Sequence, residues 1–280
     1  MFKKISSVIG TITLICFSFY YTDSAIDIVR KTDPIMKEIE NFSNNYGNTS
    51  IDSIIVNNNI VPGIKGTIVD IEESYNNMKR LGKFDESLIV FEEILPTNTI
   101  VDNFDNYIIS GNTSKSNVSL VFPINDPSYV EEIIKILDTK NVKATFFVNS
   151  ELFDSSMDMV RLIITSGNTV ELLDESYDPT LIRKYNYNKK ILINESLNFC
   201  YTNSKNQNLI NNCKSNKMHT IIPSINSINY PYNEVKTNLK NGSIISLSNN
   251  QNTVRELSAL INYIHQKGKN IVSLEKLLEE

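Results

Sequence analysis

The sequence is short of the residues that mark several classes of protein. Tryptophan is absent, and only two histidines and three cysteines occur in 280 residues. The 27 Lys and Arg residues are outnumbered by 32 Asp and Glu residues, so the formal net charge is -5, and no basic tract is found. An acidic chain without such a tract is poorly suited to hold nucleic acid through its phosphates. We therefore expect no nucleic-acid partner. Asn and Ile are over-used, which we ascribe to an AT-rich coding sequence rather than to a prion-like tract.

The few cysteines leave one question open. Cys16 directly follows Ile15, and this bulky residue makes a poor lipoprotein signal. Cys200 and Cys213 show no metal-site spacing with other ligands. In an oxidising compartment these two could pair across a short loop, and a free buried pair is an equal alternative.

The N-terminus carries a targeting signal. Lys3 and Lys4 precede an uncharged, mostly apolar run from Ile5 to Tyr21. This run, roughly 17 residues, is long for the apolar part of a signal peptide and short for a membrane span. We expect residues 1–24 to be a signal peptide or an uncleaved N-terminal anchor. The protein would then be exported, either extracellular or anchored on the outer face of the cytoplasmic membrane.

Residues 25–110 are expected to form a small α+β region with a linker. Asp33 and Pro34 open a helix to about residue 43, and Asp70 caps a second helix that ends at Gly82. Short strands are expected at 51–56, 66–69 and 88–94. The polar segment 98–117 is interpreted as the linker.

In residues 111–280 the order of predicted elements changes, and short apolar strands alternate with helices of roughly ten residues. Strands are expected at 118–122, 144–148, 169–173, 219–223, 242–248 and 270–273, with another starting at Phe199. Hydrophobic residues make up 41% of the chain, which is enough for a buried core. The alternation indicates a parallel α/β sheet or barrel. In such folds the reactive groups lie at the C-terminal ends of the strands.

Two segments resemble one family. Residues 141–148, NVKATFFV, look like the second strand of the polysaccharide deacetylases, the NodB-type domain of carbohydrate esterase family 4. Residues 242–245, 252–254 and 268–274 are similar to that family's last strand, helix and strand. The resemblance covers about 117–280 and implies an α/β fold, a distorted (β/α) barrel. Residues 70–91 are similar to the leader region of a sporulation-associated branch.

The resemblance also implies a chemistry, which this sequence departs from. Active members hold a divalent metal, usually zinc, with one Asp and two His, and use a second Asp as base and another His as acid to deacetylate a sugar. In this chain the Asp pair is replaced by Pro123 and Ile124, the metal histidines by Leu173 and Tyr177, an Arg by Cys200 and the catalytic His by Ser248. We therefore expect no catalytic residue, no metal ligand and no zinc of the family type.

The remaining candidates are weaker. The two histidines, His219 and His265, are too few for the family site, and Ser248 with His219 has no third partner for nucleophilic catalysis. Acidic residues near the strand ends could bind a cation such as calcium, form an acid/base pair, or make a solvated loop. Loop tyrosines could stack on sugars or pack at the edge of the core. The acidic residues are Asp126, Glu171, Asp174, Glu175 and Asp178, and the tyrosines are Tyr177, Tyr201, Tyr230 and Tyr232. We interpret Asp126, Glu171, Asp174 and Tyr201 as a ligand groove.

Three hypotheses follow. The first is a pseudoenzyme of the family at the bacterial envelope, which binds a cell-wall glycan or acts with an envelope protein in cell-wall or spore assembly. The second is an N-deacetylase or other hydrolase of peptidoglycan or chitin-type glycans with a rebuilt metal or carboxylate site, whose activity Glu171→Ala or Asp174→Ala would abolish. The third is a diverged paralogue kept for a structural contact.

Overall fold

The computed structural model describes residues 12–18, 20–21 and 32–280. The chain forms two compact units, one with residues up to Ser50 and Lys65–Leu95, the other with Ile51–Ile64 and Pro96–Glu280. Residues 51–64 and 96–110, expected in the N-terminal region, thus lie in the second unit. Most of the expected targeting segment 1–24 lies outside the described residues. No described helix combines the length and apolar character needed to cross a membrane.

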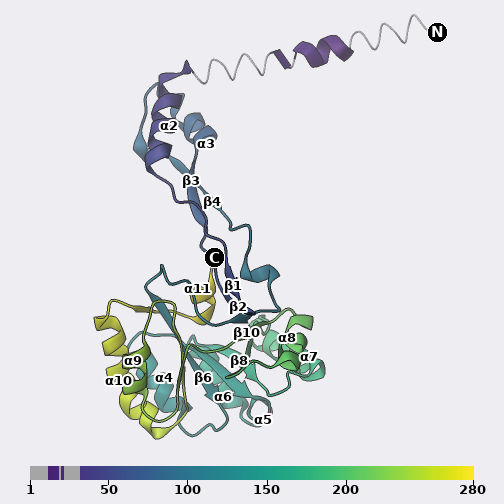
Figure 1. Cartoon of the computed structure of the whole chain (residues 1–280), viewed down its shortest axis with the longest axis vertical. Coiled ribbons are helices and arrows are strands. Elements are labelled where there is room, and N and C mark those ends of the chain that lie inside the picture. The colour runs from purple at the N-terminus through teal and green to yellow at the C-terminus, as the bar shows by residue number, and fades with distance from the viewer. Residues whose placement is uncertain (1–11, 19, 22–31) are drawn as a thin grey trace, which may run out of the picture. The chain divides into compact units, whose positions relative to one another are not determined.

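The first unit packs two helices with a two-stranded sheet (Figure 1). Its elements are α2 (Pro34–Asn45), β3 (Gly66–Asp70), α3 (Ile71–Met78), the 3-10 turn η1 (Glu86–Leu88) and β4 (Val90–Ile94), with β3 and β4 antiparallel. Asp33 caps α2 by accepting a hydrogen bond from the N–H of Ile35 at 2.9 Å. Asp70 caps α3 through the N–H of Glu73 at 2.8 Å. The helix starts predicted from these two caps are confirmed.

The second unit contains two sheets. The six-stranded sheet is parallel and has the order β11 (Ile225–Ser227), β12 (Ile244–Leu247), β6 (Asn117–Ile124), β7 (Thr145–Asn149), β8 (Thr169–Leu173), with β13 (Asn270–Ile271) also pairing with β6. The five-stranded sheet has the order β1 (Ile54–Val56), β2 (Asn59–Val61), β5 (Tyr107–Ile108), β10 (His219–Ile221), β9 (Phe199–Tyr201), and only β1 runs antiparallel to its neighbour.

Helices cover these sheets and bury their apolar sides. They are α4 (Val130–Thr139), α5 (Ser150–Ser155), α6 (Met157–Thr165), α7 (Pro179–Ile193), α8 (Gln207–Ser215), α9 (Pro231–Asn238), α10 (Gln251–Gln266) and α11 (Leu274–Leu278), with the 3-10 turn η2 (Ile100–Asp102) before β5. In α4 the buried residues Val130, Ile133, Ile134 and Leu137 repeat at helical spacing. The helix α10 contacts both α4 and α9, and Figure 1 draws these three helices on the same side of the second unit.

The α/β class with a parallel sheet is confirmed. In the second unit, the strand pairs among the described residues form two sheets, and no closed ring of strands is detected there. Besides the 3-10 turns η1 and η2, five helices and strands were not expected: β2, β5, α5, β11 and α9. Each strand among them has only two or three residues, too few to show a period in the sequence.

Side chains connect the two sheets where β8 and β9 lie next to each other without a strand ladder. Oε2 of Glu171 accepts hydrogen bonds from the N–H groups of Asn198 at 2.9 Å and Phe199 at 3.1 Å. The hydroxyl of Tyr177 donates to the carbonyl of Leu172 at 2.8 Å and accepts from the N–H of Tyr201 at 2.7 Å. We call these contacts the β8–β9 seam.

A buried lysine supports the seam. The Nζ of Lys189, from α7, lies 2.9 Å from Oε1 of Glu171, and both side chains are fully buried. Burial raises the pKa of Glu171, while Lys189 and the two backbone donors act in the opposite direction. A charged partner and two donors together satisfy a carboxylate that would be very costly to bury alone.

We expect Lys189→Met to destabilise the protein by about 3–5 kcal/mol, because it leaves a carboxylate buried without its counter-ion. Adding Glu171→Gln should recover part of the loss, since glutamine keeps an oxygen for the two backbone donors and carries no charge. Urea unfolding of the two single variants and the double variant measures the coupling.

Lys184→Met is the matched control, because Lys184 pairs with Asp154 at 2.5 Å where both side chains are about half exposed. Its loss should cost less than about 1 kcal/mol. Equal losses for the Lys184 and Lys189 variants would contradict the role given to the buried pair.

Candidate functional site

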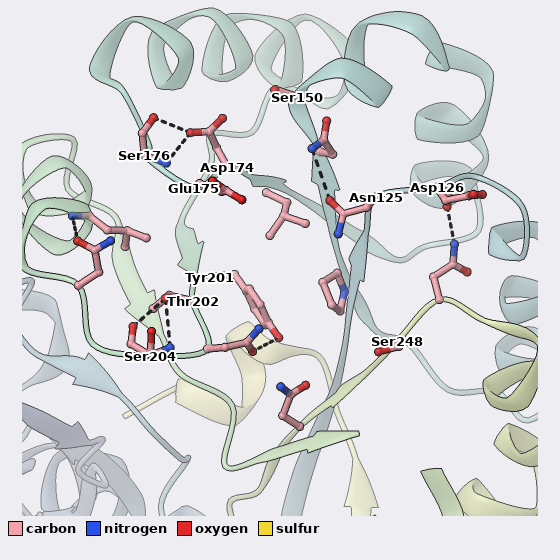
Figure 2. A pocket seen from close by; sticks show the side chains of 18 of the residues that line it. Asn125, Asp126, Ser150, Asp174, Glu175, Ser176, Tyr201, Thr202, Ser204 and Ser248 are labelled. Carbon is pink, nitrogen blue, oxygen red and sulfur yellow. Dashed lines mark hydrogen bonds between the residues drawn. The ribbon is translucent and has the colours of Figure 1, made fainter. Parts of the chain in front are cut away.

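A pocket of about 1090 Å³ opens where the parallel strands end (Figure 2). Its walls come from the residues that end or follow β6, β7, β8, β9, β11 and β12. Reactive groups were expected at the C-terminal strand ends, and the pocket lies there, as is usual in parallel α/β folds.

Amides, hydroxyls and carboxylates make up most of the pocket lining. The amides and hydroxyls belong to Asn125, Asn149, Ser150, Ser176, Tyr201, Thr202, Asn203, Ser204, Asn206, Asn226, Ser248 and Asn249, the carboxylates to Asp126, Glu151, Asp174 and Glu175, and the apolar side chains to Pro123, Leu173, Leu209 and Ile228. Such a surface offers many hydrogen-bonding atoms of the kind that bind a polar ligand.

Three of the six substituted family positions lie together in this pocket. Pro123, Leu173 and Ser248 line it, from β6, β8 and the end of β12. Ile124 is fully buried in the core, because successive residues of a strand point to opposite faces. The pocket therefore brings together part of the predicted set, and it leaves Ile124, Tyr177 and Cys200 outside.

Tyr177 and Cys200 are both held in the interior. Tyr177 is fully buried, and burial raises the pKa of its hydroxyl, which forms part of the β8–β9 seam. Cys200 forms a disulfide with Cys213 of α8. The structure thus selects the paired alternative for these cysteines. The disulfide ties the ends of a segment that contributes Tyr201, Asn206 and Leu209 to the pocket wall.

The two pocket aspartates each stabilise a local turn. Oδ1 of Asp126 accepts from the N–H of Ser128 at 2.6 Å and from the Ser128 hydroxyl, and these bonds lower the pKa of Asp126. Oδ1 of Asp174 accepts from the N–H groups of Ser176 at 2.9 Å and Tyr177 at 2.8 Å. Figure 2 shows the two aspartates on opposite sides of the pocket, so they do not converge on one cation.

The predicted ligand groove of Asp126, Glu171, Asp174 and Tyr201 needs one correction. Glu171 does not line the pocket, because it is fully buried in the seam. The ring of Tyr201 does line it, and its hydroxyl donates to Oδ1 of Asn203 and bonds to Oγ of Ser246, both at 2.8 Å.

Of the other acidic and aromatic candidates, only Glu175 lines the pocket. Asp178 caps α7 through the N–H of Thr180 at 2.8 Å. Tyr230 and Tyr232 do not line the pocket. Tyr232 packs edge-on against the ring of Tyr263, with 5.4 Å between the centroids.

Neither histidine lines the pocket. His219, in β10, stacks on Phe104 with 4.3 Å between the ring centroids, and His265 lies in the last turn of α10. The described residues hold no group of three or more His, Cys, Asp or Glu placed to bind a metal. The donor set therefore does not fit the one-Asp, two-His centre that the resemblance implies.

The asparagines of the pocket were not predicted from the sequence. Six of the lining residues are asparagines. Asn226 lies within β11, and the other five end or follow strands: Asn125, Asn149, Asn203, Asn206 and Asn249. Their position at strand ends was a usable signal, but the general excess of asparagine concealed it.

The family resemblance is confirmed for the central part of the chain. Residues 110–241 match the family model for polysaccharide deacetylase. This region is therefore similar to a polysaccharide deacetylase domain, as the strand motifs had implied.

Individual relatives extend the likeness beyond this region. The uncharacterized protein YlxY of Bacillus subtilis (strain 168) is 23% identical over 284 residues, which cover 91% of this chain and 86% of YlxY. Wild-type BA3943 of Bacillus anthracis, a CE4 family pseudoenzyme, is similar in structure with a TM-score of 0.69 and 22% identity, over 89% of this chain and 96% of that chain. The Bc1960 peptidoglycan N-acetylglucosamine deacetylase has a TM-score of 0.55 and 21% identity, over 62% and 95% of the two chains.

The stability of the fold should depend on pH through His219. Burial lowers the pKa of His219 from 6.5 to about 4. Between these values the unfolded chain binds a proton that the folded chain does not, so stability falls as the pH drops from 6.5 towards 4. The loss should reach about 2–3 kcal/mol.

Urea unfolding over this pH range checks the expectation. His219→Phe should keep the stack on Phe104 and flatten the profile, since phenylalanine does not titrate. His265→Phe is the control and should leave the profile unchanged. A His219→Phe profile as steep as that of the wild type would show that other groups cause the pH dependence.

Proposed function

We infer that this protein is a polysaccharide deacetylase-like pseudoenzyme that binds a cell-wall glycan at the bacterial envelope. The observation that carries the proposal is the side-chain set at the strand ends. Pro123, Leu173 and Ser248 face the pocket where the family chemistry requires carboxylate and imidazole groups. Proline and leucine neither bind a cation nor transfer a proton.

Two further features support the absence of the family reaction. The sequence has only two histidines, and both lie in other parts of the fold. The hydroxyl of Tyr177 is engaged with Leu172 and Tyr201 and is withdrawn from solvent. The similarity of fold to BA3943, a CE4 family pseudoenzyme, agrees with this reading.

The pocket itself supports the binding role. It retains a large polar hollow whose amides and hydroxyls suit the hydroxyl groups of a sugar chain. The similarity to a peptidoglycan N-acetylglucosamine deacetylase suggests a cell-wall glycan as the ligand class. The location at the envelope rests on the charged and apolar pattern of residues 1–24.

The proposal predicts binding without turnover. The purified chain should sediment with isolated peptidoglycan and should release no acetate from peptidoglycan or chitin oligomers, with or without added zinc. Ser248→Trp should weaken sedimentation by at least about tenfold, since a large ring in the pocket costs at least about 1.4 kcal/mol of binding.

Thr139→Trp, at the exposed C-terminal end of α4 and outside the pocket, is the matched control and should bind normally. Zinc-dependent acetate release that Ser248→Trp abolishes would replace the pseudoenzyme with an active hydrolase. A wild-type chain that does not bind peptidoglycan would remove the binding role.

A further inference from the structure

We propose that the pocket prefers glycans with free amino groups, such as oligomers of glucosamine, over glycans whose amino groups are acetylated. The inference rests on the proposed function, because it specifies the charge of the glycan that the same pocket would hold. Three observations support it: the negative charge of the pocket, the lack of ion pairs at its four carboxylates in the described part of the chain, and the side chains of Asn249 and Ile228.

The pocket concentrates one sign of charge. The carboxylates of Asp126, Glu151, Asp174 and Glu175 line it, and no Lys, Arg or His is among its described lining residues. The whole chain has 27 basic against 32 acidic residues, so its surface elsewhere is nearly balanced. A cleft lined by one sign of charge attracts ligands of the opposite sign.

The four carboxylates also lack counter-ions. No ion pair joins any of them to a Lys or Arg in the described part of the chain. Elsewhere in the same unit, Asp105, Glu131, Asp138 and Asp154 each pair with a lysine. The oxygens Oδ2 of Asp126 and Asp174 accept no hydrogen bond from the described residues, because their turns use Oδ1. A bound ammonium group would therefore have free acceptors.

Two uncharged features point to a ligand independently. Oδ1 of Asn249 is buried and accepts no hydrogen bond from the residues that the structure describes, whereas Nδ2 of the same partly buried side chain donates to the carbonyl of Asp126. A buried acceptor of this kind is costly unless a donor reaches it. Ile228 lines the same pocket and is 55% exposed, which offers an apolar surface at a polar rim.

An amino-sugar chain meets these requirements together. Its hydroxyl and ammonium groups donate hydrogen bonds, its ammonium group carries the complementary charge, and one face of its ring is apolar. Acetylation removes the charge and reduces the donors on that nitrogen to one. Exposed ion pairs each strengthen binding by up to about fivefold, so two such contacts should give a preference of about tenfold.

Calorimetric titration of the full chain with short oligomers of glucosamine and of N-acetylglucosamine tests the inference. The titration is carried out at about pH 6. We expect the glucosamine oligomer to bind about tenfold more tightly at low salt, with the preference decreasing as salt is added.

The combined variant Asp126→Asn with Asp174→Asn should remove most of this preference. Asparagine keeps the Oδ1 acceptor that each turn needs, so the variant should fold. Glu132→Gln with Asp158→Asn makes the same change of charge at exposed positions outside the pocket and should keep the preference.

The outcomes separate this inference from the proposed function. Equal or tighter binding of the acetylated oligomer would overturn the charge preference while glycan binding stands. An equal loss of preference in both combined variants would also overturn it, because the attraction would then belong to the acidic protein as a whole. If neither oligomer binds but peptidoglycan still sediments with the chain, only this inference fails.

Discussion

The β8–β9 seam is the contact on which the second unit depends. The backbone groups at the start of β9 have no ladder partner in β8, and an unpaired buried N–H is costly. Glu171 supplies an acceptor for Asn198 and Phe199, and Tyr177 supplies one for Tyr201. Lys189 then compensates the charge of Glu171. These side chains connect the five-stranded sheet to the six-stranded sheet. They also hold Tyr201, where one wall of the pocket begins, in place.

The seam also constrains what the pocket can do. Tyr177 stands at a position that the family resemblance assigns to a metal-binding histidine, and here its hydroxyl is consumed by two backbone groups. Glu171, the most deeply buried of the predicted acidic cluster, is committed to the same task. The two aspartates left in the pocket are held by local turns on opposite walls. Tyr177 and Glu171 therefore stabilise the fold and are not free to act on a ligand in the pocket.

Much of the fold could be predicted from the sequence because long apolar strands and capped helices carry local signals. The caps Asp33 and Asp70 and the strand of residues 144–148 are examples. The site was predictable only in part. The ends of the strands could be located from the sequence. The face of β6 to which Ile124 points depends on strand register. The pairing of Glu171 with Lys189 depends on how α7, which carries Lys189 18 residues further along the chain, packs against β8. Contacts between residues far apart in the chain produce no periodic pattern in the sequence.

Amide exchange at Phe199 and Tyr201, followed by NMR in the wild type and in Tyr177→Phe, tests the central claim most directly. Both amides should be protected in the wild type, since each donates to a buried side chain. Removing the hydroxyl should accelerate exchange at Tyr201 by at least about tenfold and leave Phe199, which Glu171 holds, unchanged. A Tyr201 amide that exchanges freely in the wild type, or that stays protected without the hydroxyl, would contradict the seam.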